Sequence, residues 1–257
     1  MPDKRKGRST SWGGVAPWYH TLLEDGGSTY QRDLILPALL RILGAVRGVR
    51  VLDIGSGQGF FSRAFHAAGA AVSGVDISPE LVTLARKSSP KEVRFSVAPA
   101  ETLPFPDASF DRAVIVLALQ NIRDAQRALA EAARVLVPGG RLVVVLNHPS
   151  FRVPRFSGWG WDAELGRQYR RVDRYLTEIA EEIVMHPGEE KSPTTLSFHR
   201  PLQYYAKALV KSGFSIVRLE EWNSHKVSEP GPRARAEDRA RKEIPLFLCI
   251  EARREES

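Results

Sequence analysis

VLDIGSGQGF, residues 51–60, is the stretch that decides the fold of this 257-residue chain. An apolar strand runs directly into Asp53, a loop with glycines at 55, 57 and 59, and the start of a predicted helix. Glycines let the backbone approach a ligand closely, and the N–H groups that open a helix point at such a ligand. We therefore predict a cofactor site where this strand ends.

The glycine spacing bears on which cofactor is bound. A dinucleotide-binding loop has the pattern G-x-G-x-x-G, and counting from Gly55 and Gly57 places Phe60 where the third glycine should stand. The spacing therefore argues against a dinucleotide.

Outward from this loop, short apolar runs alternate with helical stretches. The runs fall at 49–54, 71–77, 93–98, 112–119 and 141–147, with predicted helices at 60–68, 79–87 and 123–135. Such alternation is typical of a parallel sheet with helices on both faces, an α/β fold. After an interruption, a helix near 201–212 and strands at 214–222 and 244–252 are predicted to complete the sheet.

The interruption divides the chain into four predicted parts. Residues 1–47 form an N-terminal helical lid, 48–147 the cofactor-binding core, 148–200 an insertion and 201–257 the completion of the sheet. Nine of the 22 aromatic residues lie within 148–205, so the insertion is either a packed subdomain or the lining of a substrate pocket. Its segments 176–186 and 193–200 are predicted to form a hairpin.

The arginines of QYRRVDRY, 168–175, allow two interpretations. Arg170, Arg171 and Arg174 are suited to binding an acidic substrate, but we favour a solvated helix face on which they pair with Asp173 or Glu178.

Composition excludes several classes of protein. With 43% apolar and 26% charged residues, the chain has the composition of a soluble globular protein. It contains no run of 18 apolar residues and no signal-peptide core, so we expect a cytoplasmic protein without a membrane span. A single cysteine, Cys249, excludes an internal disulfide; we expect it to be buried, and we expect no metal site.

Asp76 follows the second predicted strand, in GVDIS, where a carboxylate can accept both hydroxyls of a ribose. The alternative is that Asp76 caps the next helix. Ser78 suits that role better, because Pro79 then takes the first helical position.

DIGSGQG, VDIS, PAETLPFPDASFD and ARVLVPGGRLVVV occur here in that order and spacing. Together they resemble class I S-adenosylmethionine-dependent methyltransferases, especially the branch of the menaquinone/ubiquinone C-methyltransferases. The resemblance covers residues 48–147. It implies a Rossmann-like seven-stranded sheet whose last strand is antiparallel, with S-adenosylmethionine as cofactor and S-adenosylhomocysteine as product.

The resemblance also implies which residues hold the cofactor. The methionine part would lie against Asp53, Leu117 and the loop Gly55, Ser56, Gly57, Gln58 and Gly59. The ribose would lie at Asp76 beside Ile77, and the adenine at Ala100 and Glu101. Pro99 stands where many relatives have an aspartate, so adenine recognition falls to backbone groups or to Glu101. Tyr19, Tyr30 and Gln31 either contact the methionine carboxylate from the lid or belong to a packed helix face.

Acceptor residues are expected at the carboxyl ends of the strands, where open α/β sheets bind ligands. We predict Asn121, His148, Trp159, Trp161, Tyr169 and Trp222 as substrate-binding residues. If the nucleophile must lose a proton, His148 is the first candidate base, followed by His225 and His20. The alternative is that His148 only completes the turn NHPS by hydrogen-bonding the backbone.

These expectations define a leading function and two alternatives. The leading one is in-line methyl transfer to an oxygen or carbon of a small aromatic or apolar acceptor. The net charge of +7, with its basic residues at 4–8, and the arginine-rich stretch 152–174 suggest RNA methylation instead, although no N-P-P-[YF]-like tetrapeptide follows the fourth strand, so nucleic acid is not favoured. The third is a cofactor-binding protein without transfer activity. The oligomeric state stays open.

Overall fold

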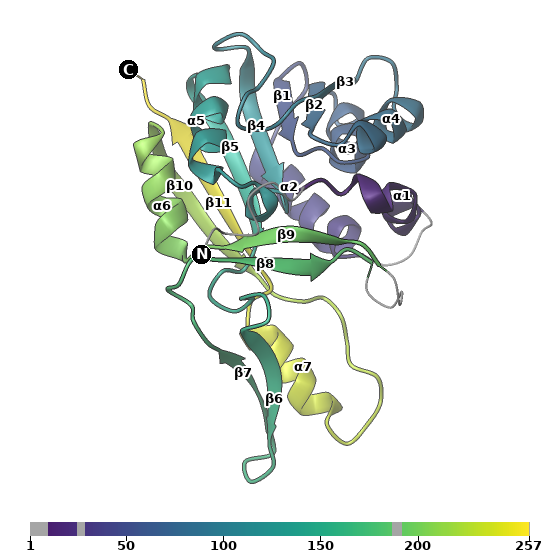
Figure 1. The fold of residues 1–257 in the computed structure, drawn as a ribbon, viewed down its shortest axis with the longest axis vertical. Coiled ribbons are helices and arrows are strands. Elements are labelled where there is room, and N and C mark those ends of the chain that lie inside the picture. The colour runs from purple at the N-terminus through teal and green to yellow at the C-terminus, as the bar shows by residue number, and fades with distance from the viewer. Residues whose placement is uncertain (1–9, 25–28, 187–191, 257) are drawn as a thin grey trace, which may run out of the picture.

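A computed structural model describes residues 10–24, 29–186 and 192–256; the basic segment 4–8 and the turn at 187–191 lie outside these ranges. Its centre is a seven-stranded sheet in the order β3-β2-β1-β4-β5-β11-β10 (Figure 1). The strands are β1 (Arg50–Ile54), β2 (Ala71–Asp76), β3 (Arg94–Val97), β4 (Phe110–Val116), β5 (Leu136–Asn147), β10 (Phe214–Trp222) and β11 (Phe247–Arg254). Strands β1 to β5 pair in parallel, and β11 runs antiparallel to both β5 and β10. The predicted sheet with an antiparallel last strand is confirmed.

Helices cover both faces of the sheet, because its central strands are apolar on both sides. One face packs on α5 (Ala125–Val135) and α6 (Leu202–Lys211). The other packs on α2 (Leu36–Leu43), α3 (Phe60–Ala67) and α4 (Pro79–Ser88). Cys249 lies in this second core and is buried, as predicted; burial raises the pKa of its thiol to about 12.

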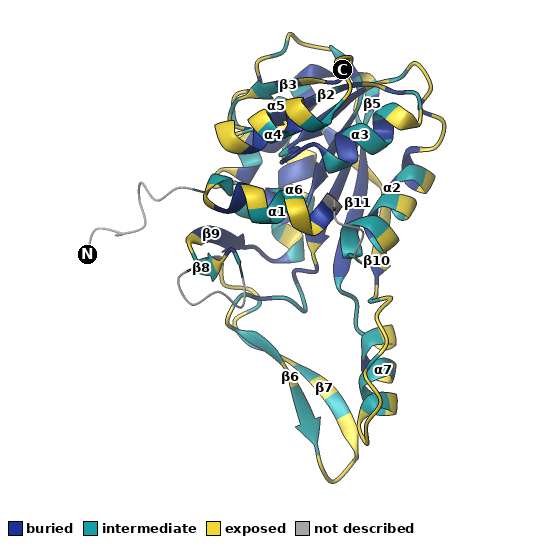
Figure 2. Cartoon of the chain, turned by 90° about the vertical axis from the view of Figure 1, so that its right-hand side faces the viewer, coloured by how far each residue is buried: buried dark blue, intermediate teal, exposed yellow. Residues whose placement is uncertain are grey.

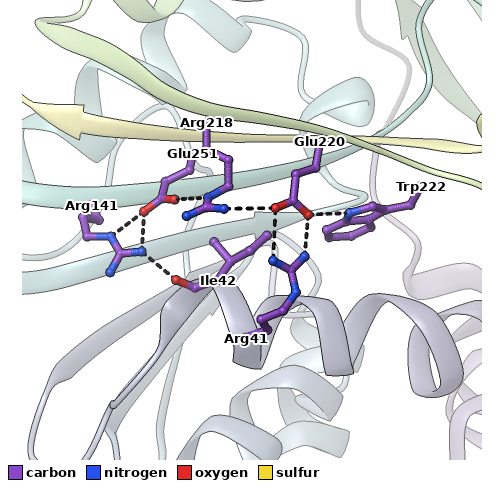
Figure 3. A network of polar contacts seen from close by, with 7 residues as sticks. All are labelled: Arg41, Ile42, Arg141, Arg218, Glu220, Trp222 and Glu251. Atoms are coloured by element: carbon purple, nitrogen blue, oxygen red, sulfur yellow. Dashed lines mark hydrogen bonds and ion pairs between the residues drawn. The ribbon is translucent and has the colours of Figure 1, made fainter.

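A chain of charged side chains joins α2 to the antiparallel end of the sheet (Figure 3). Glu251 of β11 is 5% exposed and lies between two arginines, accepting from Arg141 and, at 3.0 Å, from Nε of Arg218. Arg218 also donates to Glu220 at 3.2 Å, and Glu220 in turn accepts from Arg41 of α2 at 3.1 Å. Sequence patterning did not predict this network, since its members are far apart in the chain.

The insertion after β5 forms two hairpins that are separate from the main sheet. β8 (Ile179–Val184) pairs with β9 (Thr194–His199), which confirms the predicted hairpin. β6 (Ser157–Asp162) pairs with β7 (Arg167–Val172) and projects away from the sheet beside α7 (Ala234–Glu243), as Figure 2 shows. We call β8–β9 the roof hairpin, and β6–β7 with α7 the arm.

The arm corrects one expectation. Residues 167–172 form a strand and not a helix face, and successive side chains of the segment point to opposite sides of a two-stranded ribbon. The expected pairing with Asp173 is present, from Arg171 at 2.8 Å.

The N-terminal part contributes η1 (Gly13–Val15), α1 (Ala16–Glu24) and a π-helical turn η2 (Gln31–Ile35) that leads into α2. α1 packs beside α4 at the carboxyl ends of the strands. Within the described ranges, every helix is too short or too polar to cross a membrane.

Candidate functional site

A cavity of about 270 Å³ lies where the parallel strands end. Its floor comes from the carboxyl ends of the parallel strands and the segments that follow them: Gly55, Gly57, Val75, Asp76, Ile77, Leu81, Ala98, Pro99, Ala100, Glu101, Val116, Leu117, Ala118, Gln120, Asn121, Ile122 and Asn147. The N-terminal part adds Thr10, Trp12, Tyr19 and Gln31, and the roof hairpin adds Ile183 and Ser197. Segments far apart in the sequence therefore enclose one space.

The glycine loop forms one wall of the cavity, and at Gly55 no side chain fits. Gly55 has φ +74°, and a Cβ on it would lie 2.5 Å from Cβ of Ala118, the residue that follows Leu117 at the end of β4. Gly57 has φ +56° and donates its N–H to Oδ2 of Asp76 at 2.9 Å. Leu117 itself has φ +53°, a strained backbone of the kind found at functional sites.

Asp76 is held before any ligand arrives. Its Oδ2 accepts from Gly57 N, and its Oδ1 accepts from Ser78 N at 2.9 Å. Each oxygen keeps another lone pair, so the carboxylate can still accept two hydroxyls from the cavity side. Ser78 caps α4 as predicted, with its hydroxyl accepting from Leu81 N at 3.1 Å.

Asp53 lies behind the loop and not in the cavity lining. It is 1% exposed, and one carboxylate oxygen accepts from the Ser62 hydroxyl at 2.6 Å. Burial, with a smaller contribution from the negative charge of Asp76, raises its pKa to about 7. A buried carboxyl poised near neutrality responds strongly to a nearby cation.

The other predicted loop residues, Ser56, Gln58 and Gly59, lie outside the cavity lining. Ser56 and Gln58 are buried. Gly59 is the N-cap of α3 and has φ +88°. A Cβ there would lie 2.9 Å from the Phe95 ring, so a glycine is required for this ring to pack against the loop.

Two aromatic side chains of the N-terminal part close the cavity from the side. Tyr19 hydrogen-bonds Gln31, and burial raises the pKa of Tyr19 to about 12, so its hydroxyl stays protonated. Trp12 lies beside it, with ring centroids 6.0 Å apart. Sequence reasoning missed Trp12, since it lies in a short polar stretch without periodicity. Tyr30 is outside the cavity lining, with its hydroxyl 3.0 Å from the hydroxyl of Ser224.

Three buried polar atoms in the lining have no hydrogen-bond partner: Trp12 Nε1, Gln120 Oε1 and Asn121 Oδ1. Buried polar groups are almost always paired, so these atoms indicate a polar ligand in the cavity. A compound with a ribose, an amino acid end and a planar base supplies partners of this kind, and the glycine walls leave space for it. S-adenosylmethionine therefore fits the residues present.

The three candidate histidines all lie outside the cavity lining. His148 is 2% exposed; its Nε2 lies 2.7 Å from Glu221 Oε1, and its Nδ1 accepts from Ser150 N at 3.2 Å. His225 lies 3.6 Å from Asp33, and His20 is on α1.

Among the predicted substrate residues, Asn121 lines the cavity. Trp159 and Tyr169 are 41% and 49% exposed on the arm, and Trp161 lies there under Arg233, 4.6 Å from its ring centroid. Trp222 is buried and donates to Glu220 at 3.1 Å. Ile183 and Ser197 of the roof hairpin line the cavity and were missed by sequence reasoning; only the predicted hairpin could have pointed to them.

No metal-binding cluster of three or more histidine, cysteine, aspartate or glutamate residues occurs in the ranges described.

Comparison with known proteins gives consistent results. Residues 52–144 match the methyltransferase domain family. The chain is 43% identical over 115 residues to a demethylmenaquinone methyltransferase of Tropheryma whipplei, covering 44% of this chain and 48% of that protein. It is 36% identical over 159 residues to a ubiquinone/menaquinone biosynthesis C-methyltransferase of Bordetella parapertussis, covering 57% and 61%. The chain thus spans about half the length of these curated relatives.

A solved structure extends the match to nearly the whole chain. An S-adenosylmethionine-dependent methyltransferase from Mesorhizobium loti is 30% identical, with a TM-score of 0.72 over 88% of this chain and 100% of that one. With the glycine loop and Asp76 in one cavity, these matches show that the chain belongs to the class I S-adenosylmethionine-dependent methyltransferase family.

Proposed function

We propose that this protein transfers the methyl group of S-adenosylmethionine to a carbon or oxygen of a small aromatic or apolar acceptor. The observation that carries the proposal is the single cavity in which Gly55, Gly57 and Asp76 face Leu117 and Asn121. The names of the matched relatives, quinone methyltransferases, support an aromatic acceptor and a carbon nucleophile.

The residues present would hold the cofactor along the floor. Asp76 would accept the two ribose hydroxyls, and Ala100 with Glu101 would border the adenine. The methionine end would lie between Gly55, Leu117 and the Tyr19 hydroxyl, with the buried charge of Asp53 behind the loop. When bound, the cofactor supplies an electrophilic methyl group on a sulfonium, which is the leaving group and becomes a neutral thioether once the methyl group has been transferred.

The chain's own contribution would be orientation and exclusion of water. Positioning a nucleophile in line with the bond that breaks supplies much of the rate of such a transfer. The roof hairpin, part of the predicted substrate-binding insertion 148–200, covers the cavity with Ile183 and Ser197. Gln120 and Asn121 offer unpaired amide oxygens that would accept from the acceptor's hydroxyl.

A base is required only when the nucleophile must lose a proton. That His148 supplies this base stays a prediction, and so does the weaker hypothesis that His225 or His20 supplies it. Movement of the segment after β5 would have to bring His148 to the cavity, because Glu221 and Ser150 occupy both of its nitrogens. RNA methylation and cofactor binding without turnover are not favoured, since the matched relatives are named as demethylmenaquinone and ubiquinone/menaquinone methyltransferases.

The test begins with mass spectrometry of the purified protein for bound S-adenosylmethionine or S-adenosylhomocysteine, followed by calorimetric titration of both. We expect Asp76→Asn to weaken binding of either by at least about tenfold, because hydrogen bonds to a charged acceptor are each worth about 1.5–3 kcal/mol. Asp162→Asn, on the arm, is the control and should bind normally. Absence of binding in the unaltered protein would overturn the proposal.

Methyl transfer itself is tested with labelled S-adenosylmethionine and a panel of hydroquinones, phenols and aromatic acids. Transfer of label to carbon or oxygen of a panel member supports the proposed function. Binding without transfer to any panel member or to RNA would favour a protein that only binds the cofactor.

A further inference from the structure

A small chamber of about 30 Å³ adjoins the main cavity between the segment after β5 and the end of β9. Gln120, Asn147 and Ser197 line both spaces, so one molecule can extend from the main cavity into the chamber. Two arginines, Arg152 and Arg200, line the chamber as well. Nothing in the cofactor site described above uses either of them.

Arg200 is a fixed and incompletely paired cation. It is 4% exposed, and its Nη2 donates to the carbonyl oxygens of Ile122 at 3.0 Å and Arg123 at 2.7 Å. The rings of Phe198 and Tyr204 lie 5.0 and 5.1 Å from its guanidinium carbon. Its Nη1 is buried without a hydrogen-bond partner. The guanidinium is therefore held in place with one donor nitrogen unused.

Arg152 brings a second positive charge to the same chamber. It is half-buried, and within the described part of the chain no carboxylate forms an ion pair with its side chain. Burial lowers its pKa, and the nearby charge of Arg170 lowers it further. The chamber lining contains no aspartate or glutamate. Buried charges are normally neutralised by a partner, so two cations without one indicate an anionic ligand.

The size of the chamber restricts the anion. About 10–15 Å³ of such space is needed per water molecule, so this chamber holds about two to three water-sized atoms. The two oxygens of a carboxylate fit within that space, whereas the three oxygens of a phosphoryl group would need all of it. Arginine is also the residue best suited to carboxylate geometry, through paired N–H donors.

We infer that the chamber binds a carboxylate of the methyl acceptor, held between Arg152 and Arg200, while the acceptor's ring lies in the main cavity. The inference rests on the proposed function and narrows it: the acceptor is an aromatic or apolar acid. The acid group would enter between the shared lining residues Gln120, Asn147 and Ser197.

The inference is tested by titrating 2-naphthoate and its neutral analogue 2-naphthalenemethanol into the protein, alone and saturated with S-adenosylhomocysteine, by ligand-observed NMR. We expect the carboxylate to bind at least about tenfold more tightly than the alcohol. Arg152→Gln should reduce this preference to less than about threefold. Arg155→Gln is the matched control: it removes the same charge three residues away, from a side chain that is 65% exposed and paired with Glu181, and should keep the preference.

Equal binding of the two probes, or a preference that survives Arg152→Gln, would overturn the inference. Tighter binding of 2-naphthyl phosphate than of 2-naphthoate would overturn the assignment to a carboxylate. Arg200→Gln removes donors from two backbone carbonyls and can unfold the protein, so Arg152→Gln decides the result. A preference that depends on Arg152 in protein that fails to bind S-adenosylhomocysteine would support the anion site and refute the methyl-transfer proposal.

Discussion

Gly55 combines a left-handed backbone with a Cβ position that is already filled by Ala118. Gly48 has nearly the same φ, +73°, but a Cβ there would meet nothing within 4 Å. Both Gly→Ala substitutions should therefore cost about 1 kcal/mol for the left-handed backbone. Gly55→Ala should cost about a further 1–3 kcal/mol, because the new Cβ overlaps that of Ala118 and overpacking a core costs about this much.

The readout is chemical unfolding combined with titration of S-adenosylhomocysteine. We expect Gly55→Ala to weaken binding at least about tenfold, since the loop must shift away from β4. Normal binding by Gly55→Ala would show that the loop tolerates the shift, whereas loss of binding in Gly48→Ala would point to backbone strain alone.

The buried carboxyl of Asp53 leads to a second prediction, on how the stability of the protein depends on pH. Its folded-state pKa of about 7 lies above the ordinary 3.8, so the folded protein holds this proton more tightly than the unfolded chain does. The corresponding stability is fully present below pH 3.8 and is lost as the pH rises through about 7. Asp53→Asn does not ionise. Its melting temperature relative to the unaltered protein should therefore rise between pH 5 and pH 8.

Asp107→Asn supplies the comparison, because Asp107 is 77% exposed and pairs with Arg134 at the surface. Its melting temperature relative to the unaltered protein should not rise over this interval. If Asp53→Asn shows no rise either, Asp53 is not protonated in the folded protein.

At the scale of elements, the charged network of Figure 3 ties α2, β5, β10 and β11 together. Glu251→Gln leaves Arg141 and Arg218 close together without the carboxylate between them. We expect the free energy of unfolding to fall by about 2 kcal/mol. Removing one partner of a fully buried ion pair costs about 3–5 kcal/mol, and the loss is smaller here because both arginines are partly exposed.

Glu256→Gln is the matched control for this substitution. Glu256 is 76% exposed and pairs with Arg253 at 3.5 Å, so its loss should change stability by less than about 0.5 kcal/mol. Urea unfolding measures both variants. Equal effects would show that the buried position of Glu251 carries no special weight.

Elements also show what the sequence predicts and what it does not. The strands around Leu52, Val114 and Val144 were predictable, because apolar runs buried on both faces leave a continuous signal. The strand 167–172 was not, since its three arginines fall on both faces of a ribbon that lies outside the core. The periodicity of apolar residues arises where one face of an element is buried against a core. The arm lies outside the core, so its sequence carries little such periodicity.

The site divides in the same way. Gly55, Asp76 and Leu117 line one cavity because they lie at the ends of strands that meet at one edge of the sheet, which is why the sequence could bring them together. The roof residues Ile183 and Ser197 were missed, since their position depends on how a separate hairpin folds over that edge. Aromatic enrichment pointed instead to Trp159 and Tyr169, which lie exposed on the arm. Composition locates an insertion but not the direction in which it folds.

For the whole molecule, the cavity and the arm should respond differently to ligand. S-adenosylhomocysteine should slow amide hydrogen exchange in the segments that line the cavity, 55–57, 98–101 and 117–122, and in the roof hairpin. Exchange in β6, β7 and α7 should not change, because none of them contributes to the lining. Mass-spectrometric exchange with and without ligand measures this. Protection of the arm would show that its aromatic residues fold over the bound ligand.

The separate hairpins have a consequence for how such a protein diversifies. The floor that would hold the cofactor is made by strand ends of the seven-stranded sheet, whereas the roof belongs to a two-stranded sheet of its own. The hydrogen bonds that hold Asp76, from Gly57 and Ser78, involve no residue of the roof, so changes in the length or sequence of the roof leave them intact. New acceptor preferences can thus arise by exchange of one peripheral segment, and grafting that segment is a natural starting point for redesigning specificity.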